Sequence, residues 1–581
     1  MLIGLLWITI VLPWLGAACI WLVGDRHPRS LHTLAVIFAV TPGLAALGML
    51  PLASSSVAIR IPFGGIFGDF TLVPDGLGVL IAVIATLVGS LAVIFSINYM
   101  RNHEQQLARY YALILFFIGA MVGLGLSGNL LFTFIFWEIT AFCSYALISF
   151  FNDDPKAVTG GIKALIMTQL GGVGLLAGAL LIYAYLGNSQ ISNFLAQAHT
   201  LPATILSLMA FGFLVAAAAK SAQVPMHSWL PDAMEAPTPV TALIHAATMV
   251  NAGVYLLARF YPAFQGVPGW CTAVIVVGLL SALLAGLMAL AADDIKRVLA
   301  YSTVSQLGFM VYAVGTGSIF ASQLHLLSHA IFKALLFLGA GAVITAVGTR
   351  DLHSMGGLGK KMPFVRAVFI IGTLGLVGLP LANGFFSKDL ILEGGLANGP
   401  LWVYIVMLIC VGITALYSLR LVWMVFYGSP HGSEPAHDGL PAMRVSLAVL
   451  AIGTLTTWLL AGPLNRMLAA TLPFHQIEPV TTLGMVAKIF LAAPTWIVLG
   501  MIAVGFGLWI KRATFVKLTR KLKPAIASGL GFEWLNQQVV NLTTRAASIL
   551  QLSQTGQLNW NMAGILGGLL LILLVLARGA R

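Results

Sequence analysis

Long apolar runs dominate the chain, and short polar segments separate them. A helix that crosses about 30 Å of hydrocarbon needs about 20 apolar residues, and sixteen runs reach that length. The predicted spans are residues 2–23, 31–52, 75–99, 111–128, 129–150, 163–186, 203–220, 240–261, 268–291, 299–317, 320–347, 364–386, 400–427, 443–461, 486–510 and 557–578. The runs are continuous and do not alternate with polar residues, which excludes a transmembrane β-barrel. The pattern predicts an all-α polytopic membrane protein with about 16 transmembrane helices.

Two segments depart from this pattern. Residues 57–73 hold two glycines between β-prone runs, which predicts a small hairpin on the outer side. Residues 511–553 begin with a basic cluster and are too polar to span, yet apolar residues recur in them at helical spacing. These are Phe532, Leu535, Val539, Leu542, Ala546, Ile549 and Leu550. The segment predicts an amphipathic lateral helix along the inner surface, against lipid or a neighbouring subunit; a kinked linker is the alternative.

Composition supports the membrane assignment and excludes several kinds of chemistry. Of 581 residues, 59% are apolar and 8% are Asp, Glu, Lys or Arg, whereas soluble domains carry about 25% charged residues. The mean hydropathy is +0.97. The four cysteines stand alone in apolar stretches, without a CxxC pair. This argues against iron–sulfur clusters, structural zinc and a disulfide framework.

The distribution of lysine and arginine among the loops predicts the orientation. Inner loops of membrane proteins carry an excess of these residues. With the N-terminus outside, most of them fall in inner loops, among them Lys163, Lys296 and Arg420. Apart from Lys388, the outer side then holds only Arg60, Arg259, Arg466, Lys488, Arg578 and Arg581. We expect a multi-pass protein of a bacterial inner (plasma) membrane with both termini outside, whose residues 2–23 form the first span rather than a signal peptide.

Ionisable residues within the predicted spans are the first candidates for function. Each costs about 2.5–3.5 kcal/mol at mid-bilayer on insertion scales and therefore needs a reason to be there. Glu138 stands mid-span, Lys220 ends an apolar run just before Pro225, and His245 lies within residues 240–261. Each residue also has a structural alternative. Glu138 could pair with a lysine of another subunit, and the role of His245 could be limited to a hydrogen bond that joins two helices.

A second group of ionisable residues follows along the chain. It comprises His325, His329, Lys333, Lys388 and Asp389. The first three are four residues apart, so they line one stripe of a helix. Lysine is a poor zinc ligand, whereas histidine between lysines titrates near neutrality and can pass protons through either ring nitrogen. The stripe indicates a proton relay, although Lys388 could instead snorkel from a helix end.

Each of the two groups of ionisable residues lies beside a predicted break in a helix. The Glu138–Lys220 set and the Lys333–Lys388 set each end beside a segment where proline interrupts a helix. A buried lysine near a carboxylate can be switched between charged and neutral forms by moving either charge. Inverted-repeat transporters place broken helices at corresponding positions of their two halves. The arrangement therefore favours two half-channels that carry protons.

Four stretches together resemble a known family. They are KSAQVPMHSWLPDAMEAPTPVTALIHAATMV (220–250), DDIKRVLAYSTVSQLGFM (293–310), HLLSHAIFKALLFLGAG (325–341) and the region 355–392, which contains NGFFSKDLIL. The resemblance is to the antiporter-like subunit L, or chain 5, of respiratory complex I, related to Mrp-type antiporter A subunits and membrane-bound hydrogenase subunits. It implies two inverted five-helix repeats with broken helices, and a lateral helix before the last span.

The resemblance also implies a division of the chain and a role for each candidate. The divisions are 1–110 (N-terminal spans with the hairpin), 111–261 and 268–427 (two half-channels), 428–510 (C-terminal spans), 511–553 (lateral helix) and 554–581 (last span). Glu138 and Lys220 match the coupling pair of the first half-channel. The central axis is matched by His245, His325, His329 and Lys333, the exit by Lys388 with Asp389 adjacent, and a family lysine near the inner face by Lys296.

The implied function is proton translocation in a complex I-like NADH:quinone oxidoreductase. Members of the family bind no cofactor in this subunit; flavin, iron–sulfur clusters and quinone belong to partner subunits of the complex. The alternatives are a subunit of an Mrp-type sodium/proton antiporter or membrane-bound hydrogenase, and a membrane partner of an inorganic-carbon uptake complex. The pair Gly171–Gly172 resembles the Mrp type, whereas Asn251 stands where Mrp A subunits tend to carry lysine.

Overall fold

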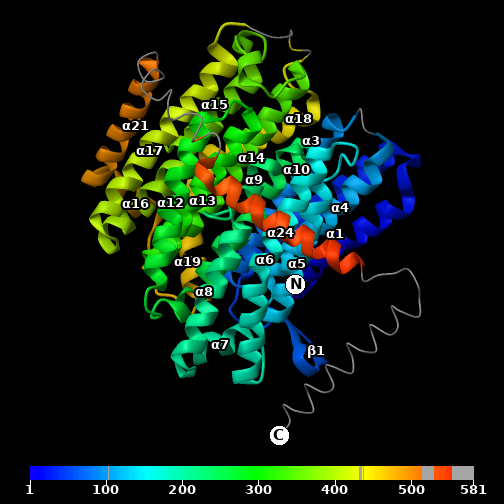
Figure 1. The fold of residues 1–581 in the computed structure, drawn as a ribbon, viewed down its shortest axis with the longest axis vertical. Helices are drawn as coiled ribbons and strands as arrows, with labels where there is room; N and C mark the ends of the chain where they lie inside the picture. Colours follow the sequence, from blue (N-terminus) through cyan, green and yellow to red (C-terminus); the bar gives the residue numbers. More distant parts are fainter. Residues whose placement is uncertain (102–103, 431–434, 436, 513–525, 527–528, 553–581) are drawn as a thin grey trace. The chain divides into compact units, whose positions relative to one another are not determined.

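A computed structural model describes the chain except for residues 102–103, 431–434, 436, 513–525, 527–528 and 553–581 (Figure 1). It divides into two compact units, Met1–Leu530 and Gly531–Arg581. The helices of the first unit are α1 (Leu2–Val23), α2 (Pro28–Met49), α3 (Gly76–Tyr99), α4 (Leu107–Leu126), α5 (Leu130–Ile148), α6 (Pro155–Leu186), α7 (Ile191–Gln197), α8 (Ala203–Lys220), α9 (Trp229–Asp232), α10 (Thr238–Ala242), α11 (Met249–Phe264), α12 (Trp270–Ala291), α13 (Ile295–Gly315), α14 (Ile319–Val347), α15 (Pro363–Val377), α16 (Asn383–Asn398), α17 (Leu401–Val422), α18 (Pro441–Thr456), α19 (Ala461–Thr471), α20 (Thr482–Leu491) and α21 (Ala493–Ile510). The second unit contributes α24 (Phe532–Leu552).

Within the described residues, fourteen helices are long and apolar enough to cross a membrane. They correspond to fourteen of the sixteen predicted spans. The predicted span 364–386 is wrong as a single helix, because α15 and α16 share it with a break between them. The predicted last span, 557–578, lies outside the described residues.

Two breaks interrupt the helices where the sequence places proline. After α15, Gly378 takes a left-handed conformation with φ 85°, and Leu381 also has a positive φ of 81°. Pro380 cannot continue the helical hydrogen bonding, so the chain resumes as α16 only at Asn383. Similarly, α8 ends at Lys220 and no helix forms before Trp229. Both breaks leave backbone carbonyls that other groups can use.

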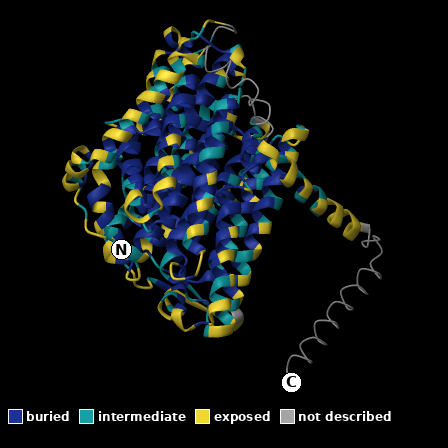
Figure 2. Cartoon of the chain, turned by 60° about the vertical axis from the view of Figure 1, so that its left-hand side comes forward, coloured by how far each residue is buried: buried dark blue, intermediate teal, exposed yellow. Residues whose placement is uncertain are grey.

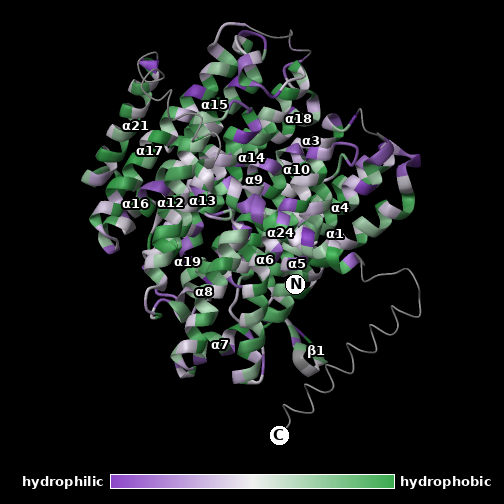
Figure 3. Ribbon diagram, in the orientation of Figure 1, coloured by the Kyte–Doolittle hydropathy of each residue, from purple (hydrophilic) through white to green (hydrophobic). Residues whose placement is uncertain are grey.

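The core of the first unit is built around a few central helices. The helices α3, α13 and α14 and the span that contains α11 are almost entirely buried, whereas α1, α2 and α21 bury only a minority of their residues. Figure 2 shows the buried residues gathered in the interior of the bundle and the exposed ones along its outer helices. The outer helix α21 is predominantly hydrophobic (Figure 3), as contact with lipid requires.

The predicted hairpin is confirmed. Strands β1 (Ile59–Gly64) and β2 (Gly68–Leu72) pair antiparallel, with Ile59 opposite Leu72. The amide Nδ2 of Asn129, the N-cap of α5, donates to the carbonyls of Phe67 and Asp69, each at 3.0 Å. The hairpin is therefore fixed to the start of α5.

The predicted lateral helix is confirmed as a helix over its described part, α24. Residues 513–525, 527–528 and 553 of the same prediction lie outside the described residues. Its docking against lipid or a neighbouring subunit stays a prediction.

Candidate functional site

Glu138 of α5 and Lys220 of α8 lie close enough to interact electrostatically. Lys220 is fully buried at the last position of α8, and its Nζ donates to the carbonyl of Trp137 at 2.7 Å. The same nitrogen lies 4.8 Å from the centroid of the Trp137 ring. Glu138 is the next residue, and its carboxylate interacts electrostatically with Lys220. Within the described residues, Glu138 Oε1 accepts no hydrogen bond, so one carboxylate oxygen remains free to take a proton.

The pair Gly171–Gly172 on α6 makes room for this arrangement. A Cβ on Gly171 would lie 2.3 Å from the Cβ of Ala219, and a Cβ on Gly172 would lie 2.6 Å from Glu138 Oε1. Both separations are too short for real carbon contacts. The two glycines therefore let α6 approach the end of α8 on one side and the Glu138 carboxylate on the other.

His245 lies in a π-helical turn, Leu243–Ala247, between α10 and α11. Side chains five residues further on satisfy its carbonyls: Thr248 donates to Leu243 at 2.6 Å and Asn251 donates to Ala246 at 3.0 Å. Neither ring nitrogen of His245 has a hydrogen-bond partner among the described residues. Its ring centroid lies 6.0 Å from that of Trp229, whose indole N–H donates to Ala219 beside Lys220 at 3.0 Å.

Lys296 occupies the second position of α13 and is 3% exposed. Its Nζ donates to the carbonyl of Ala236 at 2.7 Å. The ammonium also interacts electrostatically with His245. It is a buried residue at the start of a span and not part of an exposed loop, and its placement near the inner face stays a prediction.

The stripe on α14 is buried as predicted, with His325, His329 and Lys333 all at 0% exposure. The imidazole rings of His325 and His329 are 6.5 Å apart between centroids. His325 Nδ1 lies 2.9 Å from Ser387 Oγ, and its Nε2 lies 3.3 Å from Gln306 Oε1. This network of hydrogen-bonding groups joins α13, α14 and α16.

Lys333 and Lys388 are anchored by backbone carbonyls. Lys333 Nζ donates to Leu299 at 3.0 Å and also to the hydroxyl of Ser302. Lys388 Nζ donates to Leu376 at 2.8 Å and to Val377 at 3.3 Å, the last two residues of α15. The break after α15 thus supplies the acceptors that hold a lysine in the interior, and Lys388 is 1% exposed, which does not fit snorkelling.

Asp389 contacts α21, whereas the adjacent Lys388 contacts the end of α15. Thr495 of α21 donates its hydroxyl to Asp389 Oδ2 at 3.0 Å. The carboxylate is 4% exposed.

Apart from Glu138, which is half-buried, the structure buries every candidate residue, and it brings them together in two sets. One set contains Glu138 and Lys220, and another contains the α14 stripe with Lys388, which interacts electrostatically with Lys333. His245 stands between the sets, because His329 lies beside the backbone of the neighbouring Ala246. Sequence reasoning missed Gln306, Ser302 and Ser387 as members of the second set.

Three basic residues that the prediction counted among the inner loops or on the outer side are buried inside helices. Lys163 of α6 pairs with Asp232 at 2.7 Å, and Arg420 of α17 pairs with Asp293 at 2.5 Å. Arg259 of α11 forms a buried ion pair with Asp75, its Nη2 donating to Oδ1 at 2.9 Å. Lys163 and Arg420 were wrongly counted among the inner loops, because each charge is neutralised by a partner 69 or 127 positions away that no local pattern reveals.

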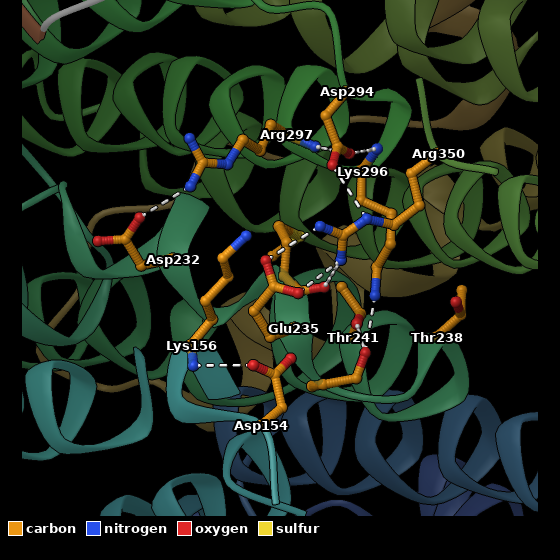
Figure 4. Close-up of polar contacts among 12 residues, drawn as sticks. Asp154, Lys156, Asp232, Glu235, Thr238, Thr241, Asp294, Lys296, Arg297 and Arg350 are labelled. Carbon is orange, nitrogen blue, oxygen red and sulfur yellow. Dashed lines mark hydrogen bonds and ion pairs between the residues drawn. The ribbon is translucent and has the colours of Figure 1, made fainter. Parts of the chain in front are cut away.

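Ion pairs continue around the start of α13 (Figure 4). Arg350 donates to both carboxylate oxygens of Glu235, at 2.9 and 3.0 Å, and its Nε lies 3.0 Å from Asp294 Oδ2. Asp294 Oδ1 in turn caps α13 by accepting from the backbone N–H of Lys296 and Arg297. The ends of three helices are therefore held together by charge. Among the described residues, no group of three His, Cys, Asp or Glu side chains is arranged to hold a metal ion.

Comparisons with known proteins agree with this architecture. The family described as "NADH:quinone oxidoreductase/Mrp antiporter, TM" matches residues 127–414, and the family described as "NADH-Ubiquinone oxidoreductase (complex I), chain 5 N-terminus" matches residues 61–111. The NADH-quinone oxidoreductase subunit L of Escherichia coli K12 is 35% identical over 99% of both chains. The NAD(P)H-quinone oxidoreductase chain 5 of Synechocystis is 38% identical over 76% of this chain and 69% of its own.

Solved structures show the same fold. The Mrp complex of a Dietzia species contains a chain that superposes with a TM-score of 0.81 at 26% identity, covering 99% of this chain and 63% of that one. An archaeal membrane-bound sulfane sulfur reductase contains another, with a TM-score of 0.70 at 25% identity, covering 86% of this chain and 99% of that one.

The chain therefore belongs to the family of antiporter-like membrane subunits that NADH:quinone oxidoreductases and Mrp antiporters share. Within that family it is related along its whole length to subunit L of NADH-quinone oxidoreductase. The identification made from the sequence motifs is confirmed.

Proposed function

We propose that this chain carries protons across the membrane as the subunit L-type component of an NADH:quinone oxidoreductase. Electron transfer from NADH to quinone takes place in partner subunits that hold flavin and iron–sulfur clusters, and it drives proton movement here. The observation that carries the proposal is the electrostatic interaction of the half-buried Glu138 carboxylate with the fully buried Lys220, whose ammonium donates to the carbonyl of the adjacent Trp137.

The electrostatics of this pair supply the coupling. A buried lysine beside a carboxylate keeps its proton while the carboxylate is charged and close, and it releases the proton when that charge is removed or neutralised. A disturbance that reaches Glu138 from a neighbouring subunit thereby ejects a proton from Lys220. His245 and the α14 stripe accept and pass the proton on, and Lys388 is the last lysine before the outer side.

The orientation belongs to the same proposal. The face that carries Lys156, Arg297 and Arg350 lies on the inner side, as the excess of basic residues indicates. The protein resides in the bacterial inner membrane with its N-terminus outside.

The test uses the intact complex in inverted membrane vesicles. Lys220→Ala abolishes NADH-driven proton uptake while the complex still assembles. Glu138→Gln has the same effect because it removes the switching charge without changing the shape of the side chain. Normal proton uptake in assembled Lys220→Ala complex contradicts the proposal.

The similarity to the Mrp complex supports a second candidate, a subunit of a cation/proton antiporter. In that case, proton movement depends on a sodium gradient and not on NADH. Purification of the tagged chain with its partners separates the two, because only the first complex contains flavin and iron–sulfur proteins.

A further inference from the structure

The face that carries the ion pairs of Figure 4 contains an open cavity of about 500 Å³. A volume of this kind needs only about 10–15 Å³ to hold one water, so the cavity has room for many. The residues around it include the charged and polar Lys156, Glu235, Asp294, Tyr301 and Arg350, and apolar residues such as Ala292 form part of the wall. A cavity of this size with charged walls is wetted, unlike an apolar void.

The cavity ends where the buried axis begins. Glu235 lines it, and the carbonyl of the next residue, Ala236, accepts the hydrogen bond from Lys296 Nζ at 2.7 Å. Glu235 also interacts electrostatically with Lys296. The charge of Lys296 in turn interacts with His245. An ordered sequence of groups therefore leads from water, through one carboxylate, to the interior.

We propose that this cavity is the entrance through which protons reach the axis, and that Glu235 accepts them from water and passes them to Lys296. This proposal rests on the proposed function. In the first step a hydronium ion loses its proton and an O–H bond forms on the Glu235 carboxylate. In the second step that O–H bond breaks, an N–H bond forms on the neutral amine of Lys296, and the carboxylate is restored.

Arg350 controls when the Glu235 carboxylate accepts a proton. Burial raises the pKa of Glu235, but the two hydrogen bonds and the charge of Arg350, with the charges of Lys296 and Arg297, lower it below its usual value. The pKa of Arg350 is itself raised, with the contacts to Glu235 and Asp294 outweighing burial. Lys156 of α6 lines the same cavity. While Arg350 is paired with Glu235, the Glu235 carboxylate is a weak base. If Arg350 moves so that it pairs with Asp294 alone, the Glu235 carboxylate becomes a stronger base and accepts a proton more readily.

Glu235→Gln tests the acceptor, because glutamine keeps the shape and the hydrogen-bonding oxygen but carries no transferable proton. Removal of a proton acceptor typically costs at least about 100-fold in the step that it serves. We expect NADH-driven proton uptake in inverted vesicles to fall by at least about tenfold. The loss should be greater at pH 8.5, where protons are scarcer, than at pH 6.5.

Asp438→Asn is the matched control. Asp438 is 14% exposed and pairs with Arg444, whereas Glu235 is 15% exposed and pairs with Arg350. Asp438 does not line the cavity, so its variant pumps like the wild type. Equal losses in the two variants would overturn the proposal, because the effect would then come from removing any paired carboxylate.

A second variant tests the cavity even if Glu235→Gln fails to assemble. Ala292→Cys places a small thiol on the cavity wall without altering the backbone carbonyl that accepts from Arg420. A membrane-impermeant thiol reagent added to inverted vesicles modifies this cysteine and blocks proton uptake, while treated wild type keeps its activity. Absence of modification, or modification without loss of uptake, overturns the proposal.

Failure of this inference is distinguishable from failure of the proposed function. Inactive Lys220→Ala with fully active Glu235→Gln rejects the entrance alone. Fully active Lys220→Ala rejects the proposed function itself.

Discussion

Replacing Gly172 by alanine would displace the Glu138 carboxylate without removing it. The new Cβ would lie 2.6 Å from Glu138 Oε1, about 0.8 Å short of the 3.4 Å at which ordinary contact begins. The obstacle is the far end of a flexible side chain, so an off-rotamer shift of about 0.5–1.5 kcal/mol relieves the clash. The complex should therefore assemble normally.

The loss should appear in the rate of proton transfer. Transfer between two groups requires heavy atoms about 2.6–3.2 Å apart, directly or through one water, and a misplacement of about 1 Å can cost about 100-fold. We expect proton uptake per assembled complex in the Gly172→Ala variant to fall by about 10- to 100-fold. The assay is the initial rate of NADH-driven uptake in inverted vesicles, with the amount of complex measured in the same membranes.

Two other glycines separate this effect from general damage. Gly500 of α21 has nothing within 4 Å of an added Cβ, so Gly500→Ala should leave uptake and assembly unchanged. An added Cβ on Gly174 would lie 2.3 Å from the backbone oxygen of Gly212. Gly174→Ala should therefore lower the amount of folded complex, at about 1–3 kcal/mol. Wild-type uptake by assembled Gly172→Ala complex would refute the reasoning that the position of Glu138 matters.

Three further predictions concern charge. Arg259→Leu leaves Asp75 buried without its partner and should destabilise the purified protein by about 3–5 kcal/mol, seen as a lower unfolding temperature; an unchanged temperature would mean that the ion pair has no structural role. Burial lowers the pKa of His475 to about 4, so the folded protein keeps this residue neutral while the unfolded chain binds a proton below about pH 6.5. The wild type should therefore lose up to about 3 kcal/mol more stability than His475→Asn as the pH falls from 6.5 to 4, and parallel unfolding curves would contradict this. Lys388→Met keeps the length of the side chain but carries no proton, so it should abolish proton uptake in assembled complex; retained uptake would remove Lys388 from the pathway.

The sequence predicted the helices and the breaks because both depend on local properties. Long apolar runs define spans, and Pro380 interrupts one of them whatever its tertiary surroundings. The stripe of His325, His329 and Lys333 was equally accessible, because residues four apart share one face of any helix. Predictions of this kind need no knowledge of which helices are neighbours.

The contacts between distant segments could not be predicted in the same way. The partner of Arg259 lies 184 positions away at Asp75, and no local pattern marks the two as a pair. Ser302 and Ser387 join the buried network, but serine occurs in many spans and carries no charge that would single it out. One signal was available: two adjacent glycines at 171–172 in a helix indicate close approach of a neighbour.

The π-helical turn at His245 sets the direction of every side chain that follows it on α11. It contains one more residue than an ordinary helical turn would use. Deletion of one residue from Leu243–Ala247 would restore a regular helix and rotate the part of the helix after the deletion by about 100°. Tyr255 would then turn away from the carbonyl of Gly125, to which it donates at 2.9 Å, and Arg259 would turn away from Asp75. The extra residue of the π-helical turn thus sets the rotation of α11 about its own axis. An insertion or deletion in this turn should therefore be far less tolerable than a substitution.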